Sequence, residues 1–289
     1  MKLLRIADIC CGIGGMRLAA NIAGQTCNIK IDCVFSCDKD KFARKTYFEN
    51  FNEYPKGDLL KIDSNAIPNH DLLLSGFPCQ PFSCAGKKLG LKDDRTDVFR
   101  VIVNVLKLKA PAFFLLENVA GLKGFNKGND FEYILKNLRE ADYECRYKII
   151  NSINYIPQNR KRIYIAGVHK SISGYKKITG KIFNKKPGKN IIHGFDQTFY
   201  KQERKFHFKK YENYCYTLTA SMVNSGTVPI IKQGNLYRKL TPKECAVNFM
   251  GFPRDYIFPV SDTQSYRQIG NSIVIPVVED IIKNMINKF

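Results

Sequence analysis

Short apolar runs alternate with amphipathic stretches along the first 169 residues of the chain. Six runs have the composition of buried strands, at residues 3–9, 33–38, 70–77, 112–119, 144–152 and 162–169. Apolar residues at helical spacing follow several of these runs, most clearly at 97–110 and 131–141. Continuous apolar strands that alternate with amphipathic helices are typical of an α/β fold with a doubly wound, mostly parallel sheet.

The pattern changes near residue 170. Residues 170–239 contain 15 Lys and Arg residues against three acidic ones, and no clear alternation of strands and helices is evident there. A last amphipathic helix is predicted at 276–289, where the α/β pattern returns. We therefore expect a large α/β domain made of residues 1–169 and 266–289, and a smaller, irregular, β-rich domain at 170–265.

The charge of the chain favours a polyanionic partner. Lys and Arg number 46 against 26 Asp and Glu, which gives a formal net charge of +20 in 289 residues. A protein that neutralises phosphates releases their condensed counterions, so such an excess suits nucleic acid. A Lys-rich composition without a binding role is the alternative.

The cysteines and the apolar runs indicate a chain with reduced thiols and no membrane span. None of the ten cysteines forms a C-x-x-C pair, and the four histidines are not spaced as metal ligands beside them. We expect no metal site. No apolar run reaches the length of a membrane span, and the first residues lead directly into a predicted strand, so we expect no export signal and an intracellular protein.

Polar residues follow several predicted strands, at the edge where an open α/β sheet binds its ligands. A glycine turn at 11–15 follows the first strand, and its backbone can approach a ligand closely. Asp38 ends the second strand, where an acid can accept hydrogen bonds from ribose hydroxyls, and Asp58 could bind an adenine amine. Each acid could instead cap a helix or lie on the surface.

Three more candidates lie on later segments. Cys79 stands between Pro78 and Gln80 in a loop of small residues, and as a thiolate it would be a nucleophile. Glu117 comes at the end of the strand at 112–119, where burial would raise the pKa of a carboxyl group. Arg160 and Arg162 alternate at the start of a strand and share one face. Cys79 could instead be an inert buried thiol, and the two arginines could belong to a charged, solvent-exposed face.

These segments, in this order, resemble the DNA (cytosine-5-)-methyltransferase family of prokaryotic and phage restriction-modification systems. The matching motifs are DICCGIGG, GFPCQPFS, ENV, QNRKR, RKLTPKECAVNFMGFP and QIGNSIVIPV. The resemblance runs from about residue 3 to residue 288, and only the basic segment at about 170–237 lacks a strong match. It implies a Rossmann-like methyltransferase domain with a target-recognition domain at 170–265.

The resemblance also implies the reaction. Cys79 would attack carbon 6 of a flipped-out cytosine and so make carbon 5 nucleophilic toward the methyl group of S-adenosyl-L-methionine. Glu117 would contact ring nitrogen 3 and the exocyclic amine, and Arg162 would bind the oxygen at position 2. Supporting roles would fall to Asn118, Gln158 and Arg160.

Further site residues follow from the same resemblance. The cofactor S-adenosyl-L-methionine would contact Cys10, Gly12, Ile13, Gly14, Gly15, Asp38, Lys39, Asp58, Leu59, Pro78, Asn271 and Ile273. Cys10 and Lys39 replace residues that are often aromatic in the family, so we expect weaker cofactor binding. Thr96 stands where glycine is usual, at the distal end of the loop that Cys79 would lead.

The expected partner is double-stranded DNA. The residues expected to contact it are Gln80, Ser83, Ala85, Thr217, Leu218 and Arg238. The resemblance further implies a monomer in the cytoplasm of a prokaryotic cell, with a restriction endonuclease of the same specificity as a possible companion. The recognition sequence is not evident from the residues.

Two other functions are compatible with parts of the sequence. Transfer-RNA cytosine-5 methyltransferases carry a Cys-Phe-Thr element, which Cys215-Tyr216-Thr217 resembles, but the next three residues do not continue that pattern. An inactive homologue that only binds DNA or another partner would be expected to lose the nucleophile, the ENV acid or the cofactor glycines. All of these are present.

Overall fold

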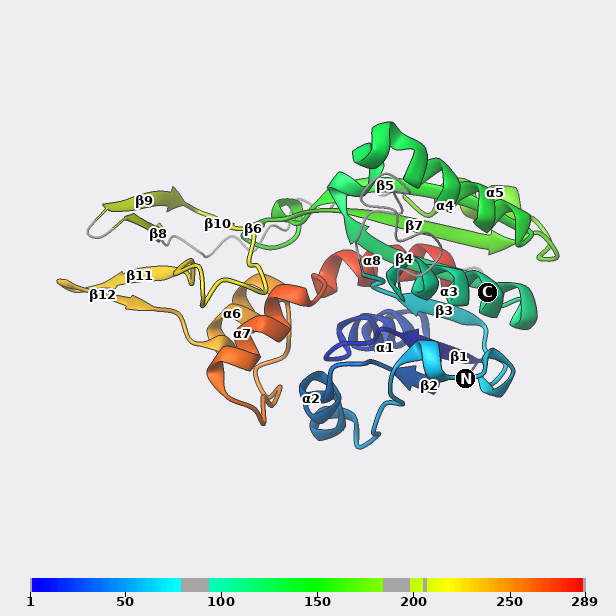
Figure 1. Ribbon diagram of the computed structural model, residues 1–289, viewed down its shortest axis with the longest axis horizontal. Coiled ribbons are helices and arrows are strands. Elements are labelled where there is room, and N and C mark those ends of the chain that lie inside the picture. Colours follow the sequence, from blue (N-terminus) through cyan, green and yellow to red (C-terminus); the bar gives the residue numbers. More distant parts are fainter. Residues whose placement is uncertain (1, 79–93, 184–197, 205–206, 288–289) are drawn as a thin grey trace.

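The computed structural model describes residues 2–78, 94–183, 198–204 and 207–287. A six-stranded sheet with helices on both faces forms the body of the protein, and a lobe built on a smaller sheet extends from one end of it (Figure 1). This arrangement confirms the predicted α/β fold with a second, β-containing part.

The large sheet is mostly parallel. Its strands, in spatial order, are β2 (Ile29–Cys37), β1 (Lys2–Ile9), β3 (Leu72–Ser75), β4 (Phe113–Val119), β7 (Lys161–His169) and β5 (Tyr143–Asn151). Only β7 runs against its neighbours, because it pairs antiparallel with both β4 and β5. As a consequence, β7 begins at the edge of the sheet where the parallel strands end. Residues just before and within β7 therefore lie beside the ends of β1, β3 and β4.

Helices cover both faces of this sheet, as alternate side chains on the strands require. Helices α1 (Gly15–Cys27) and α8 (Ile275–Ile286) pack on one face, while α3 (Asp94–Lys109) and α4 (Asn129–Glu140) pack on the other. In β3, Leu72 and Leu74 point toward α1 and α8, and Leu73 points toward α3 and α4. Helix α2 (Lys41–Phe51) follows β2 at the side of the sheet (Figure 1).

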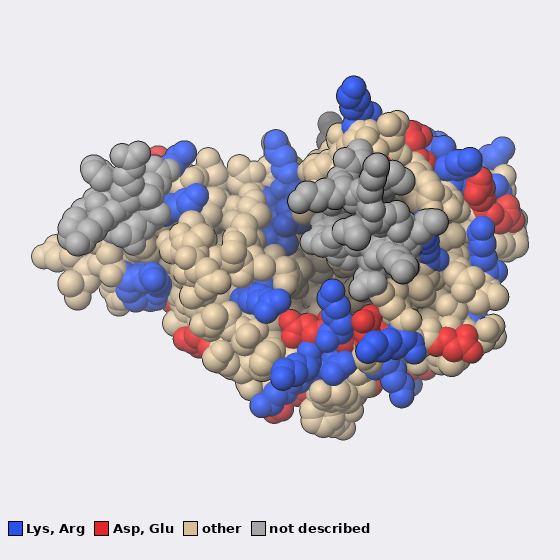
Figure 2. All heavy atoms as spheres, viewed as in Figure 1, with Lys and Arg blue, Asp and Glu red and all other residues tan. Residues whose placement is uncertain are grey.

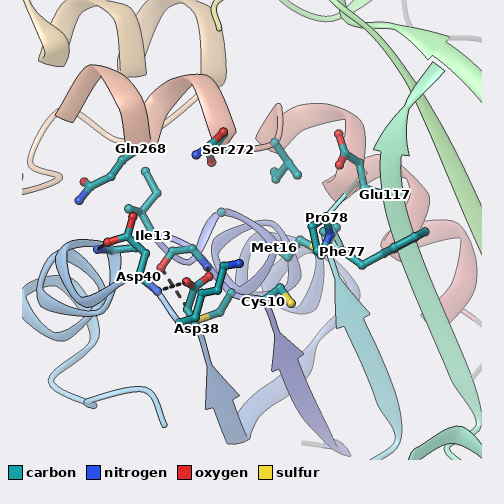
Figure 3. A pocket seen from close by; sticks show the side chains of 18 of the residues that line it. Cys10, Ile13, Met16, Asp38, Asp40, Phe77, Pro78, Glu117, Gln268 and Ser272 are labelled. Carbon is teal, nitrogen blue, oxygen red and sulfur yellow. Dashed lines mark hydrogen bonds between the residues drawn. The ribbon is translucent and has the colours of Figure 1, made fainter. Parts of the chain in front are cut away.

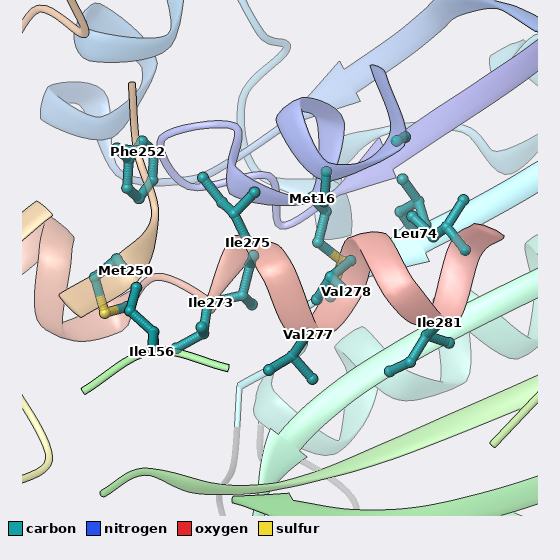
Figure 4. Close-up of a cluster of buried hydrophobic side chains, with 14 of the residues drawn as sticks. Met16, Leu74, Ile156, Met250, Phe252, Ile273, Ile275, Val277, Val278 and Ile281 are labelled. Carbon is teal, nitrogen blue, oxygen red and sulfur yellow. The ribbon is translucent and has the colours of Figure 1, made fainter. Parts of the chain in front are cut away.

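One hydrophobic core continues from the body into the lobe. Met16 of α1 and Leu74 lie against Val278 and Ile281 of α8, and the same cluster reaches Met250 and Phe252 beyond the body (Figure 4). Burial of such side chains stabilises the fold by about 1.5–3 kcal/mol each. The continuous core fixes the lobe against the carboxyl edge of the large sheet.

The lobe has an antiparallel sheet and two helices. Its four strands, in spatial order, are β12 (Leu236–Lys239), β11 (Ile230–Gln233), β8 (Thr198–Arg204) and β9 (His207–Glu212). A separate parallel pair joins β10 (Cys215–Tyr216) to β6 (Gln158–Asn159), which directly precedes β7. Helices α6 (Pro242–Met250) and α7 (Asp262–Asn271) connect the lobe to α8.

The sequence patterns did not predict α6 and α7, although a signal for α6 is present. The side chain of Thr241 accepts a hydrogen bond from the Glu244 amide while Glu244 caps the Thr241 amide, and Pro242 occupies the first helical position. This capping box is a sequence signature of a helix start. Helix α5 (Tyr175–Lys181), also inside the expected small domain, packs on β5, β7 and α8 of the body.

No helix within the described ranges is both long enough and apolar enough to cross a bilayer.

We expect Gly167→Ala to destabilise the fold. Gly167 of β7 lies opposite Phe114 of β4, and a β-carbon added there would come within 2.1 Å of the Phe114 ring. Overpacking of this kind costs about 1–3 kcal/mol. The matched control is Gly180→Ala in α5, where no atom lies within 4 Å of the added carbon and alanine favours the helix. Chemical denaturation that finds equal stability for the two variants would contradict this packing argument.

Candidate active site

A cavity of about 760 Å³ opens at the carboxyl edge of the large sheet. Its walls come from the turn after β1, the start of α2, the segment after β3, the end of β4, the start of β7 and the link between α7 and α8. Figure 3 shows Asp38, Glu117, Pro78 and Ser272 facing this space from different elements. The cavity therefore lies where an open α/β sheet binds ligands.

Most of the residues singled out in the sequence line this cavity. They are Cys10, Gly12, Ile13, Gly15, Asp38, Lys39, Asp58, Leu59, Pro78, Glu117, Asn118, Arg160, Arg162, Asn271 and Ile273. Gly14, Gln158, Thr217, Leu218 and Arg238 do not line it. Four further predicted residues lie outside the described part of the chain, within the segment 79–93: Cys79, Gln80, Ser83 and Ala85.

The turn after β1 is held open by residues with left-handed backbone angles. Gly14 has a φ of 80°, and a β-carbon there would lie 2.2 Å from the Phe51 ring, so only glycine fits. At Gly12, in contrast, an added β-carbon would meet nothing within 4 Å, because the backbone faces the cavity. The Tyr256 hydroxyl donates a hydrogen bond to the Ile13 carbonyl and fixes the turn from the lobe side.

Asp38 connects two of the cavity walls. One carboxylate oxygen accepts a hydrogen bond of 2.8 Å from the Gly12 amide, and the other accepts one of 2.8 Å from the Asp40 amide. Burial raises the pKa of Asp38, and the two amide hydrogen bonds oppose that shift. Each oxygen keeps a further lone pair for a donor in the cavity. Asp58 also lies in the wall, where it caps a short helical turn through the Leu60 amide.

Glu117 and Arg162 form a partly desolvated ion pair on the opposite wall. Arg162 Nε lies 3.1 Å from Glu117 Oε1, and the two side chains are 16% and 11% exposed. The alignment is not that of a hydrogen bond, so Oε1 has no hydrogen-bond partner among the described residues. Burial raises the pKa of Glu117, while the charges of Arg162 and Arg160 oppose this rise. The pairing of β4 with β7 brings these two residues together.

Arg160 is buried and joins three segments of the chain. Its guanidinium donates hydrogen bonds to the carbonyls of Leu218 at 2.7 Å, Gly270 at 3.1 Å and Ser272 at 2.6 Å. Burial, together with the neighbouring charge of Arg162, lowers the pKa of Arg160 to about 10. The residue stays charged at neutral pH, and it ties Leu218 of the lobe to the end of α7, where Asn271 lies.

Gln158 connects the same regions without reaching the cavity. Its side-chain oxygen accepts a 3.0 Å hydrogen bond from the Leu218 amide, and its amide nitrogen donates to the Phe249 carbonyl. Together with Arg160 it satisfies both backbone groups of Leu218. Gln158 therefore supports the site through packing of the lobe.

Asn118 fixes the backbone that leads to Cys79. Its amide nitrogen donates a 3.0 Å hydrogen bond to the carbonyl of Phe77, and its oxygen accepts one from the Val119 amide. Phe77 is buried against Phe99 of α3. Phe77 and the adjoining Pro78 are thus held against β4, beside Glu117.

Arg238, expected at the DNA, makes its contacts within the lobe. Its guanidinium donates to both carboxylate oxygens of Glu244, at 2.9 and 2.7 Å, and to Gln233. The hydrogen bonds from Arg238 lower the pKa of Glu244 to about 2. Thr217 likewise donates to the Asn159 carbonyl. Their roles toward DNA stay predictions.

Several cavity residues were not identified from the sequence. Asp8 of β1 is 1% exposed, and neither carboxylate oxygen has a hydrogen-bond partner among the described residues. Burial raises the pKa of Asp8 to about 8. Gln268 of α7 accepts a hydrogen bond from Thr46 of α2 and also lines the cavity. The sequence did contain a signal for Asp8, because this residue is a polar side chain near the end of an apolar run that is predicted to be a buried strand.

The part of the chain that the structure describes contains no group of three or more His, Cys, Asp or Glu side chains that could hold a metal ion. The eight cysteines described are free thiols.

Comparison with known proteins places the chain in a family. A family model described as C-5 cytosine-specific DNA methylase matches residues 4–210 and 173–287. The chain is 40% identical to the Type II methyltransferase M1.ScrFI of Lactococcus lactis subsp. cremoris, over 98% of this chain and 78% of that one. It is 38% identical to the Type II methyltransferase M.SsoII of Shigella sonnei, over 98% of this chain and 80% of that one.

Solved structures show the same fold. The Dnmt2 methyltransferase of S. pombe superposes with a TM-score of 0.74 at 22% identity and 98% coverage of both chains. A putative DNA modification methyltransferase from an E. coli prophage gives 0.69, with 98% and 99% coverage. The ordered motifs, the cavity and the match over nearly the whole chain agree, and this protein belongs to the C-5 cytosine-specific DNA methylase family.

Proposed function

We propose that the protein transfers a methyl group from S-adenosyl-L-methionine to carbon 5 of a flipped-out cytosine in a short duplex DNA sequence, through a covalent adduct on Cys79. The observation that carries this proposal is the convergence of two sites in one cavity. Glu117 and Arg162 lie on one wall, the glycine turn and Asp38 lie on another, and Pro78, the residue before Cys79 in the sequence, lines the same cavity.

The groups in the cavity fit the proposed cofactor. The start of α1 has no side-chain cap, so its amides suit a carboxylate, and the unpartnered oxygens of Asp8 suit an ammonium group. Asp38 and Asp58 offer acceptors to hydroxyl and amine donors, and Leu59 adds an apolar contact. The bound cofactor would supply an electrophilic methyl group. We assign its binding to these residues and to the others expected from the sequence.

Glu117 and Arg162 suit a cytosine ring. Burial raises the pKa of Glu117, and in its protonated form this carboxyl group can donate to ring nitrogen 3 while its second oxygen accepts from the exocyclic amine. The guanidinium of Arg162 can donate to the oxygen at position 2. Both contacts strengthen as negative charge builds on the ring, which is the condition for catalysis. The burial of Glu117 therefore serves the chemistry directly.

Cys79 would carry the covalent step. Its thiolate would add to carbon 6 as the 5,6 double bond opens, and carbon 5 would use that electron pair to bond the methyl group, whose bond to the cofactor's sulfonium sulfur breaks and leaves a neutral thioether. A base then removes the proton from carbon 5, the sulfur–carbon bond breaks, and the thiolate is restored. Asn118 supports this step by holding the Phe77 carbonyl, two residues before the nucleophile.

The target cytosine must leave the helix, because attack comes from the face of the ring. Lys and Arg side chains lie along the hollow between the lobe and the body, where they can bind phosphates (Figure 2). We assign the lobe, within residues 170–265, to target recognition, with Thr217, Leu218 and Arg238 near the DNA. The names of the relatives support a role in a Type II restriction-modification system. We further assign the protein, as expected from the sequence, to act as a monomer on cytoplasmic DNA.

Covalent trapping tests the role of Cys79. Duplex DNA that contains 5-fluorocytosine in the recognition sequence should stay attached to the enzyme in the presence of cofactor, because fluorine cannot leave as a proton does. We expect a shifted band on a denaturing gel for the parent and for Cys27→Ser, and none for Cys79→Ala. A trapped adduct on transfer RNA instead of DNA would favour the transfer-RNA alternative, and an adduct with Cys79→Ala would exclude this nucleophile.

Glu117→Gln should lower the rate of methyl transfer by about 10²- to 10⁴-fold. Because burial raises the pKa of Glu117, its protonated form persists to higher pH than for an exposed carboxyl. The rate of the parent should therefore fall as pH rises through that pKa, and this fall should be absent in the variant. Tritium transfer measured at saturating DNA across pH checks both effects. Glu140→Gln, on the exposed face of α4, is the control, and equal rates in both variants would contradict the role of Glu117.

Asp38→Asn should weaken cofactor binding by about 10- to 100-fold. The NH₂ group of the asparagine cannot accept, so the variant loses the hydrogen bond from either the Gly12 or the Asp40 amide. It also loses the negative charge that would attract a hydrogen-bond donor of the bound cofactor. Asp63→Asn is a matched control, since the Asp63 carboxylate also accepts a backbone hydrogen bond, from the Asn65 amide, but Asp63 does not line the cavity. Titration calorimetry that gives both variants the affinity of the parent would refute the assignment.

A further inference from the structure

One peptide unit in the turn after β1, between Ile13 and Gly14, is held by two hydrogen bonds. The Gly14 amide donates to the Cys11 carbonyl at 2.8 Å, within the turn itself. The Ile13 carbonyl accepts from the Tyr256 hydroxyl, which comes from a distant part of the chain. Gly14 has a φ of 80°, and a glycine adopts positive or negative φ at little cost, so the local backbone does not fix this peptide. The two hydrogen bonds together set its orientation.

Tyr256 reaches the turn from outside the cavity. It lies in the segment between α6 and α7, is 4% exposed and does not line the cavity. Its ring packs against Phe252 and Phe258, with centroid distances of 4.7 and 5.4 Å. Burial raises the pKa of the Tyr256 hydroxyl, so this group keeps its proton and remains a donor. The packed ring therefore holds a hydrogen-bond donor in place at Ile13.

The residue next to Tyr256 is tied to a second wall of the cavity. The Asn50 side chain of α2 donates to the Ile257 carbonyl at 2.8 Å and accepts from the Ile257 amide at 2.9 Å. The first turn of α2 lines the cavity through Lys41 and Phe42. The segment that carries Tyr256 is thus fixed relative to α2 as well as to the glycine turn.

The orientation of the Ile13–Gly14 peptide bears on what the cavity can bind. Ile13 lines the cavity together with Gly12 and Gly15, and the Gly12 amide donates to Asp38 at 2.8 Å. Helix α1 begins at Gly15, directly after this peptide, and has no side-chain cap. Its first amides suit a carboxylate, whereas a carbonyl turned toward them would repel one. Release of the Ile13 carbonyl would therefore weaken the site for an anionic group.

We propose that Tyr256 is a positioning residue for the cofactor: its hydroxyl holds the glycine turn, before any ligand arrives, in the orientation that S-adenosyl-L-methionine binds. This inference rests on the proposed function. Without the hydroxyl, the free enzyme would divide among several orientations of the turn, and the cofactor would bind only one of them. The apparent affinity falls by the fraction of enzyme in that orientation, while the complex, once formed, is the same.

The test compares Tyr256→Phe with the matched control Tyr143→Phe. Tyr143 is also fully buried, and its hydroxyl donates to the Pro111 carbonyl at 2.7 Å, but it does not line the cavity or contact the turn. Each variant keeps the ring and loses one hydrogen bond from a tyrosine to a backbone carbonyl, so chemical denaturation should show similar losses of stability. Only Tyr256→Phe should weaken the binding of S-adenosylhomocysteine, by about tenfold in titration calorimetry.

Two more measurements separate positioning from a general effect on the fold. In methyl-transfer kinetics, Tyr256→Phe should raise KM for S-adenosyl-L-methionine by about tenfold and keep kcat within about twofold of the parent, because only the free enzyme is changed. In the enzyme without ligand, hydrogen exchange followed by mass spectrometry should be faster at the amides of residues 11–15 in Tyr256→Phe. Tyr143→Phe should match the parent in both.

Three results would overturn the assignment of Tyr256. These are an affinity of Tyr256→Phe within twofold of the parent, an equal loss of affinity in both variants, and a fall in kcat with KM unchanged. A parent enzyme that binds no S-adenosylhomocysteine would instead overturn the proposed function, and with it any role of the turn toward this cofactor.

Discussion

The buried guanidinium of Arg160 is the interaction on which the arrangement of this site depends. Its donors bind carbonyls at Leu218, Gly270 and Ser272, which come from the lobe, from the last turn of α7 and from the residue that follows α7. Hydrogen bonds from a charged donor stabilise by about 1.5–3 kcal/mol each, and a carbonyl left unpaired in the interior is costly. One side chain thereby holds the lobe, the proposed cofactor wall and the start of β7 in a single geometry.

The direction of β7 explains why the arginines meet the acid. An antiparallel strand beside β4 begins where β4 ends, so Arg162 comes to lie beside Glu117 without any long loop. The pair is nearly closed to solvent, yet its atoms are not aligned for a hydrogen bond. An acid with a raised pKa and an unused oxygen, next to a fixed cation, can respond to charge that develops on a bound ring. The chemistry proposed for the family thus has a structural basis in the topology of the sheet.

The local patterns of the sequence predicted the individual elements of the body, but for the lobe they predicted only a β-rich character. The buried strands, the glycine turn at 11–15 and the carboxyl-edge position of Asp38 and Glu117 follow from short-range hydrophobicity and from the rule for open α/β sheets, and the structure confirms them. The pairing of β6 with β10 and the three carbonyl bonds of Arg160 join residues 57 or more apart, so no local pattern indicates them. The helix at Pro242–Met250 had a readable capping signal within a segment interpreted as irregular.

The central claim is that the cavity beside Glu117 methylates cytosine in DNA. Cells without endogenous 5-methylcytosine can express the chain, and nucleoside mass spectrometry can then quantify that base in their DNA and transfer RNA separately. The account predicts 5-methylcytosine in the DNA fraction and no increase in transfer RNA. An unmodified DNA fraction from cells that contain the folded protein would contradict it.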